Sequence, residues 1–135
     1  MLEKNQGYVL MLEADEDDRF ITHSTLHELQ VEVDIRFALT STEFFELLKN
    51  HDKPFLILLN FNAKPQSALE ILPIIKGDPS LSQIPVVVLG EMITENFIRE
   101  CYRKGAASFV LKPGSVAGTR TKIKTFFEYW QKVVE

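Results

Sequence analysis

Residues 54–62 read PFLILLNFN, and this stretch decides how the rest of the chain is interpreted. Five large apolar residues, 55–59, end abruptly at two amides, Asn60 and Asn62, which flank Phe61. A short apolar run of this kind is typical of a strand buried on both faces of a parallel sheet. Open α/β sheets carry their chemistry at the carboxyl ends of such strands, so Asn60 stands where a functional side chain is expected. A carboxylate there could act as a nucleophile or bind a metal, whereas an amide does neither well.

Comparable strand patterns recur along the chain. Apolar runs occupy residues 8–12 (YVLML), 84–89 (IPVVVL) and 108–111 (SFVL), and residues 31–39 (VEVDIRFAL) alternate in the manner of a strand nearer the sheet edge. Helical patterns separate them, beginning at a capping box over 40–43, covering 69–75 and 97–102, and beginning again at about Thr119. Pro73 is expected to kink the second of these. Five β-α units predict a doubly wound, five-stranded parallel sheet in a three-layer α/β sandwich.

The composition indicates one ordinary globular domain over residues 1–135, with 45% hydrophobic and 25% charged residues. The single cysteine, Cys101, excludes an internal disulfide, and no signal peptide or membrane-length apolar segment is evident, so a cytoplasmic location is expected. Residues 1–40 hold three Lys or Arg against nine Asp or Glu, and residues 91–135 hold eight against five. This small basic excess argues against nucleic acid as a partner and is compatible with a protein docking on the second half.

Polar and small residues follow the predicted strands at the point where each strand ends. Because the carboxyl ends of parallel strands meet at one edge of the sheet, these residues are expected to form one pocket. The predicted pocket consists of Glu13, Ala14, Asp15, Asn60, Asn62, Gly90, Lys112 and Pro113.

Around these residues the chain resembles the receiver domains of two-component response regulators, of the single-domain, CheY-like kind, over essentially its whole length. The resemblance is carried by YVLMLEADEDDRF (8–20), by residues 54–92, which include DPSLSQIPVVVL, and by CYRKGAASFVLKP (101–113). It implies a flavodoxin-like (βα)5 fold and a place in phosphorelay signal transduction. In such domains an aspartate ending the third strand receives a phosphoryl group from a histidine kinase, and two acids ending the first strand hold Mg²⁺.

Three positions depart from the pattern that the resemblance implies. Asn60 stands at the phosphoacceptor position, and an amide forms no stable acyl phosphate analogue. Ala14 stands where the second metal-binding acid is expected, and Gly90 stands where a Thr or Ser would contact the phosphoryl oxygens and act as a switch residue. Mg²⁺ binding is therefore expected to be weak or absent, and neither phosphotransfer nor an independent catalytic activity is expected.

Of the remaining positions, Glu13 is retained, and Lys112 and Pro113 are intact, with a cis peptide bond before Pro113 implied by the resemblance. Phe109 stands at the aromatic switch position of the fifth strand, but unlike a Tyr there it has no hydroxyl to form a hydrogen bond. With the metal site degraded, Lys112 is expected to pair with Glu13 and to bond the Asn60 oxygen. The net charge of this group would then be about zero, provided that Asp15 is aimed elsewhere.

The leading hypothesis is a stand-alone pseudo-receiver that acts by protein–protein interaction without being phosphorylated. Its partner would be a histidine kinase, another signalling protein or a second copy, with a homodimer formed through the fourth helix, fifth strand and fifth helix. The residues expected on that surface are Arg99, Arg103, Lys104, Arg120 and Lys122. Two alternatives remain open: phosphorylation of another residue such as Asp15, or a small-molecule sensor whose anionic ligand meets Lys112.

Two further patterns are interpreted as structural. His23 and His27 have the spacing of a zinc pair, but no third ligand is evident, so they are expected to be solvent-exposed helix residues. Glu16, Asp17 and Asp18 are expected to favour a helix N-terminus through the macrodipole rather than to form a cation site.

Overall fold

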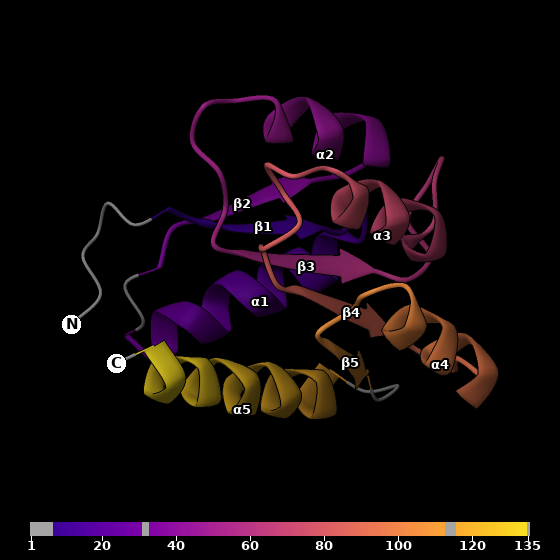
Figure 1. Ribbon diagram of the computed structural model, residues 1–135. Coiled ribbons are helices and arrows are strands. Elements are labelled where there is room, and N and C mark those ends of the chain that lie inside the picture. Colours follow the sequence, from indigo (N-terminus) through magenta and orange to yellow (C-terminus); the bar gives the residue numbers. More distant parts are fainter. Residues whose placement is uncertain (1–6, 31–32, 113–115, 135) are drawn as a thin grey trace.

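The computed structural model describes residues 7–30, 33–112 and 116–134, and its strands and helices alternate along the chain (Figure 1). The elements are β1 (Val9–Leu12), α1 (Glu16–Glu28), β2 (Ile35–Ala38), α2 (Ser41–Leu48), β3 (Leu56–Asn60), α3 (Ala68–Gly77), β4 (Val86–Gly90), α4 (Glu95–Arg103), β5 (Ser108–Leu111) and α5 (Val116–Val134).

The strands form one sheet in the order β2-β1-β3-β4-β5, and every neighbouring pair is parallel. This order confirms the predicted doubly wound α/β fold. It also places β1 and β3 side by side, with Leu12 opposite Leu59 in the register. The residues that end these two strands therefore emerge next to each other at the carboxyl edge.

The sheet is covered on both faces (Figure 1). One core contains alternate strand residues such as Leu10 and Leu59, packed with Phe44 of α2 and Ile71 of α3. The other contains the intervening strand residues, packed with Leu26 of α1 and Phe127 of α5. Burial on both faces explains why the central strands are continuous apolar runs rather than alternating ones.

Side-chain caps set where several helices begin. Thr40 accepts a hydrogen bond from the backbone N–H of Glu43, as the capping box predicts, while the Glu43 carboxylate accepts the N–H of Leu39. The helix α3 continues through Pro73 over its full assigned length. The last helix begins at Val116, three residues before the predicted start. Among the described residues, no helix is long and apolar enough to cross a membrane.

Candidate functional site at the carboxyl edge of the sheet

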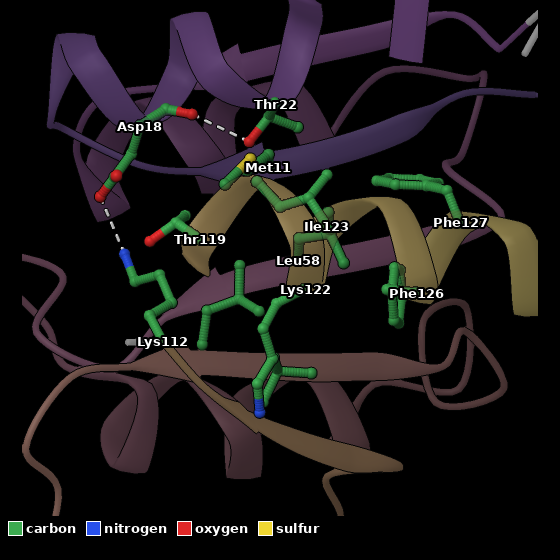
Figure 2. A pocket seen from close by; sticks show the side chains of 12 residues that line it. Met11, Asp18, Thr22, Leu58, Lys112, Thr119, Lys122, Ile123, Phe126 and Phe127 are labelled. Carbon is green, nitrogen blue, oxygen red and sulfur yellow. Dashed lines mark hydrogen bonds and ion pairs between the residues drawn. The ribbon is translucent and has the colours of Figure 1, made fainter. Parts of the chain in front are cut away.

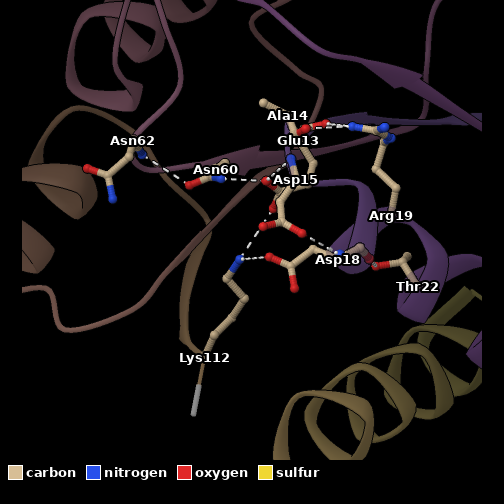
Figure 3. A network of polar contacts seen from close by, with 9 residues as sticks. All are labelled: Glu13, Ala14, Asp15, Asp18, Arg19, Thr22, Asn60, Asn62 and Lys112. Carbon is tan, nitrogen blue, oxygen red and sulfur yellow. Dashed lines mark hydrogen bonds and ion pairs between the residues drawn. The ribbon is translucent and has the colours of Figure 1, made fainter. Parts of the chain in front are cut away.

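Three of the predicted pocket residues meet at the carboxyl edge, and a fourth residue joins them (Figure 3). Glu13 follows β1, Asn60 ends β3 and Lys112 follows β5, while Asp18 reaches them from the first turn of α1. Hydrogen bonds and ion pairs connect all four side chains, and we refer to them as the edge cluster.

Glu13 is the centre of the edge cluster, with only 1% of the residue exposed. Its Oε2 accepts hydrogen bonds from Asn60 Nδ2 at 2.7 Å and from the backbone N–H of Asp15 at 3.2 Å. Its Oε1 lies 3.3 Å from Lys112 Nζ. A buried carboxylate is tolerated only when it is paired and hydrogen-bonded, and both oxygens of Glu13 have donors.

The orientation of Asn60 follows from this arrangement. A carboxylate only accepts hydrogen bonds, so the amide nitrogen of Asn60 faces Glu13 and its oxygen points the other way. That oxygen accepts the backbone N–H of Asn62 at 3.1 Å. The prediction that Lys112 bonds the Asn60 oxygen is therefore wrong, while the predicted pairing of Lys112 with Glu13 is confirmed.

The ammonium of Lys112 lies 2.9 Å from Asp18 Oδ2, closer than it lies to Glu13, and its side chain is 10% exposed. Burial alone would lower the pKa of Lys112. The hydrogen bond to Asp18, with the negative charges of Glu13 and Asp18, outweighs burial and holds the pKa above its ordinary value. Lys112 is thus a cation held between two carboxylates.

Asp18 is the member of the edge cluster that sequence reasoning missed. The sequence predicts only that it favours the helix N-terminus through the macrodipole, but its carboxylate is the nearer partner of Lys112. With Glu13 and Asp18 negative and Lys112 positive, the formal charge is −1, so the expected value of about zero is wrong. The only available signal was the position of Asp18 in the first turn of a helix that starts at this edge.

Ala14 and Asp15 lie beside the edge cluster, and they form local hydrogen bonds at the start of α1 instead of joining the side-chain contacts of the cluster. Ala14 is exposed and offers no side-chain oxygen, while its carbonyl accepts a hydrogen bond from Arg19 at 2.8 Å. Asp15 is the N-cap of α1, and its carboxylate accepts the backbone N–H of Asp18 at 3.0 Å. The carboxylate of Asp15 is therefore engaged in starting the helix.

The other predicted pocket positions are spread along the same edge. Asn62 is exposed, and Gly90 ends β4 fully buried, with its carbonyl accepting the backbone N–H of Lys112 at 2.7 Å. Phe109 is partly buried on β5. Pro113 and its predicted cis bond lie outside the described residues.

A small apolar cavity lies beneath the edge cluster, between α1, α5 and the sheet (Figure 2). Asp18 and Lys112 form its polar end, and side chains such as Leu58 and Ile123 line the rest. The cavity measures about 30 Å³, which is room for about one water molecule and too little for an organic ligand. The cavity therefore does not support a small-molecule sensor at this place.

The predicted basic surface is partly neutralised within the chain. On α4, Arg99 pairs with Glu95 at 2.7 Å and Arg103 pairs with Glu100, and Arg120 of α5 pairs with Glu28 of α1. Lys104 follows α4 and is half-buried, and Lys122 is exposed on α5.

The same surface exposes large apolar side chains, namely Phe97, Tyr102 and Leu111. We call these residues of α4, β5 and α5 the α4–β5–α5 surface.

His23 and His27 are both exposed on α1, as the sequence predicts. Within residues 7–30, 33–112 and 116–134, no three His, Cys, Asp or Glu side chains are grouped so that they could hold a metal ion. The edge cluster is included in that finding, because it contains only two acidic side chains, Glu13 and Asp18.

Known proteins with this architecture define the class. No protein-family model matches the chain. The structure superimposes on the crystal structure of the phosphorylated cyanobacterial phytochrome response regulator RcpA with a TM-score of 0.87 and 26% identity, over 94% of this chain and 95% of the other. The chain is thus similar, in fold and over nearly its whole length, to the CheY-like receiver domains of two-component response regulators.

Two comparisons with a particular relative support this. The chain is 27% identical to response regulator Rcp1 of Synechocystis sp., over 98% of this chain and 95% of that protein. The Mn²⁺-bound form of Rcp1 shares the fold, with a TM-score of 0.86 and 22% identity, over 92% of this chain and 94% of the other. Receiver domains are generally signalling modules rather than enzymes.

The raised pKa of Lys112 predicts how its contribution to stability depends on pH. A group whose pKa is raised on folding stabilises the fold below its unfolded pKa, about 10.4, and loses that contribution as the pH rises through the folded value. The difference in unfolding free energy between wild type and Lys112→Met should be constant near neutral pH and narrow above about pH 10.5. Lys49→Met, which breaks an exposed pair with Glu46, provides the control and should show little difference at any pH. Urea unfolding at successive pH values measures both, and an unchanged Lys112 difference at alkaline pH would contradict the assignment.

Proposed function

We propose that the chain, residues 1–135, is a single, stand-alone receiver domain that acts in a cytoplasmic two-component pathway by binding proteins. In this proposal Asn60 occupies the phosphoacceptor position, so the domain signals without aspartyl phosphorylation and without an enzymatic activity of its own. The partner is a histidine kinase or another signalling protein. Because RcpA is described as a phytochrome response regulator, a kinase of the phytochrome type is the first partner to test.

The hydrogen bond from Asn60 Nδ2 to Glu13 Oε2, at 2.7 Å, carries the proposal. An aspartate at position 60 would place two anionic oxygens at this distance, where they repel each other unless a cation lies between them. The amide removes the repulsion and supplies a donor to a buried acceptor. The edge cluster is therefore internally satisfied in a way that requires an amide at position 60.

The same contacts argue against a resident divalent cation, although a Mn²⁺-bound structure exists for Rcp1. A hard cation needs free carboxylate or carbonyl oxygens, and both oxygens of Glu13 already accept hydrogen bonds. Ala14 offers no side-chain oxygen, and the Lys112 ammonium is already paired with both Glu13 and Asp18. The residues present do not fit a metal ion, so no step of the proposed function uses one.

The α4–β5–α5 surface is the proposed docking site for a kinase, for an output protein or for a second copy in a homodimer. Exposed apolar side chains on α4 and β5, such as Phe97 and Leu111, give it the character of an interface centre. Lys122 supplies an exposed charge that forms no ion pair within the described part of the chain, whereas Arg99 and Arg103 would have to exchange their present partners.

The alternative of phosphorylation at Asp15 is weaker, because that carboxylate already caps α1 and lies outside the edge cluster. It remains distinguishable by experiment. A small-molecule sensor is weaker still, because the cavity below the edge cluster holds about 30 Å³.

Incubation with a small phosphodonor and Mg²⁺, followed by intact-mass measurement, tests the proposal directly. Wild type should gain no phosphoryl group and should still capture its kinase partner. The Ala14→Asp, Asn60→Asp double variant provides the matched control, since it restores the acids that the family resemblance implies. A phosphoryl adduct on wild type would contradict the proposal. Peptide mapping would then show whether Asp15 carries the phosphoryl group.

A further inference from the structure

The end of β4 has no room for a side chain. A Cβ built on Gly90 would lie 2.7 Å from Cγ1 of Ile93, 3.2 Å from Cζ of Phe109 and 3.3 Å from Cβ of Phe61. The first distance is shorter than real Cβ contacts, so the neighbours would have to move. Gly90 lies in a regular parallel strand, where backbone conformation does not demand glycine. Space, rather than conformation, is what excludes a side chain here.

Aromatic residues from three segments form a row, two members of which lie beside Gly90. The ring of Phe109 on β5 lies 6.4 Å from the ring of Phe61, which follows β3, and Phe61 lies 5.7 Å from Phe97 on α4. Aromatic pairs at these separations attract each other beyond simple burial. The row Phe109–Phe61–Phe97 therefore joins β5 to α4 across the end of β4.

Two more contacts tie the same segment together. Ile93, in the connection between β4 and α4, packs on the core beside Gly90. The hydroxyl of Tyr102 on α4 accepts the backbone N–H of Phe109 at 3.0 Å. The β4–α4 connection, α4 and β5 are thus held together from both ends of the helix.

We infer that Gly90 is a space-making residue: its missing side chain admits Ile93 and Phe109 over the end of β4, and this packing fixes the α4–β5 part of the docking surface in one arrangement without any bound group. Gly90 is then more than a lost hydroxyl. Adding a side chain at position 90 disturbs the surface instead of restoring a switch. That a disturbed surface would weaken partner binding rests on the proposed function, whereas the packing around Gly90 does not.

Gly90→Ala and Gly90→Thr test the packing, with Gly77→Ala as the matched control. Gly77 ends α3, and a Cβ there would meet nothing within 4 Å. Both Gly90 variants should lower the melting temperature by about 5 °C or more, with Gly90→Thr the worse, because overpacking a core forces side chains and backbone to shift. Gly77→Ala should stay within about 2 °C of wild type.

A rescue variant separates this packing from general destabilisation. Ile93→Ala removes the Cγ1 atom that the new Cβ meets, so Gly90→Ala should be much less harmful in the Ile93→Ala background than in wild type. Hydrogen exchange provides the readout at the surface, where the Phe109 amide and α4 should lose protection in Gly90→Ala but not in Gly77→Ala.

Strictly additive effects of the two substitutions, or a Gly90→Ala variant with wild-type exchange in α4 and β5, would overturn the inference. Neither readout involves phosphorylation. A failure here therefore leaves the phosphodonor result intact, and a phosphoryl adduct on wild type leaves the packing result intact.

Discussion

Lys112→Met is expected to lower the free energy of unfolding by about 3 kcal/mol near neutral pH, the larger of the two strongest effects that the structure predicts. Methionine replaces the apolar stem of the lysine side chain, so most of the packing beside the cavity is preserved and the charge is removed. Glu13, only 1% exposed, is then left as a buried carboxylate without its cation. A loss of this size is a large part of the stability of a domain of 135 residues. Denaturant unfolding measures it.

A second substitution, at Glu13, identifies the origin of this loss in stability. Adding Glu13→Gln to Lys112→Met removes the buried charge, while the new amide oxygen still accepts from Asn60 and from the backbone of Asp15. The double variant should therefore lose less stability than the sum of the two single variants. Asp18, 24% exposed at its side chain, can turn to water in both cases. Additive single effects would show that the Lys112–Glu13 pair contributes no coupling.

Asn60→Asp is expected to lower the free energy of unfolding by about 2 kcal/mol in the absence of divalent cations. The substitution removes the 2.7 Å hydrogen bond to Glu13 and changes the formal charge of the edge cluster from −1 to −2. Combining it with Ala14→Asp should make stability depend on Mg²⁺, because binding to the folded state alone raises stability. Wild type should show little dependence on Mg²⁺. Thermal unfolding with and without the cation checks both statements.

Asn62→Asp provides the matched control, because it makes the same chemical change two residues further along the chain. Asn62 is exposed, and it contributes only its backbone N–H to Asn60. A surface change of this kind is expected to alter stability by no more than about 0.5 kcal/mol. Equal losses for the two variants would mean that the Asn60–Glu13 hydrogen bond has no special weight.

The fold could be read from the chain because strand burial leaves a direct mark on composition. A strand covered on both faces must be apolar throughout. The chain shows this in the apolar runs at residues 8–12, 54–59 and 84–89. The position of Glu13, Asn60 and Lys112 followed from the same pattern, since parallel strands end at one edge. These predictions depend on local periodicity and chain order alone.

The partners of those residues could not be read in the same way. Whether Asn60 turns its nitrogen or its oxygen toward Glu13 depends on which neighbouring groups accept and which donate hydrogen bonds. Likewise, Lys112 forms an ion pair with Asp18 and does not bond the Asn60 oxygen. Asp18 and Lys112 are 94 positions apart, and no local pattern encodes that distance. Such choices arise only when helices and strands are packed at defined separations.

Gly90 makes the same distinction at one position. In the sequence it is simply a residue without a hydroxyl, since glycine looks alike whether it serves a turn, a helix end or a tight contact. Only the packed structure brings Ile93, Phe61 and Phe109 within 3.3 Å of the missing Cβ. Periodic burial along the chain therefore specifies the sheet and its polar edge. The charge balance of that edge and the role of its glycine are decided by contacts that form only in three dimensions, such as those of Asp18 with Lys112 and of Gly90 with Phe109.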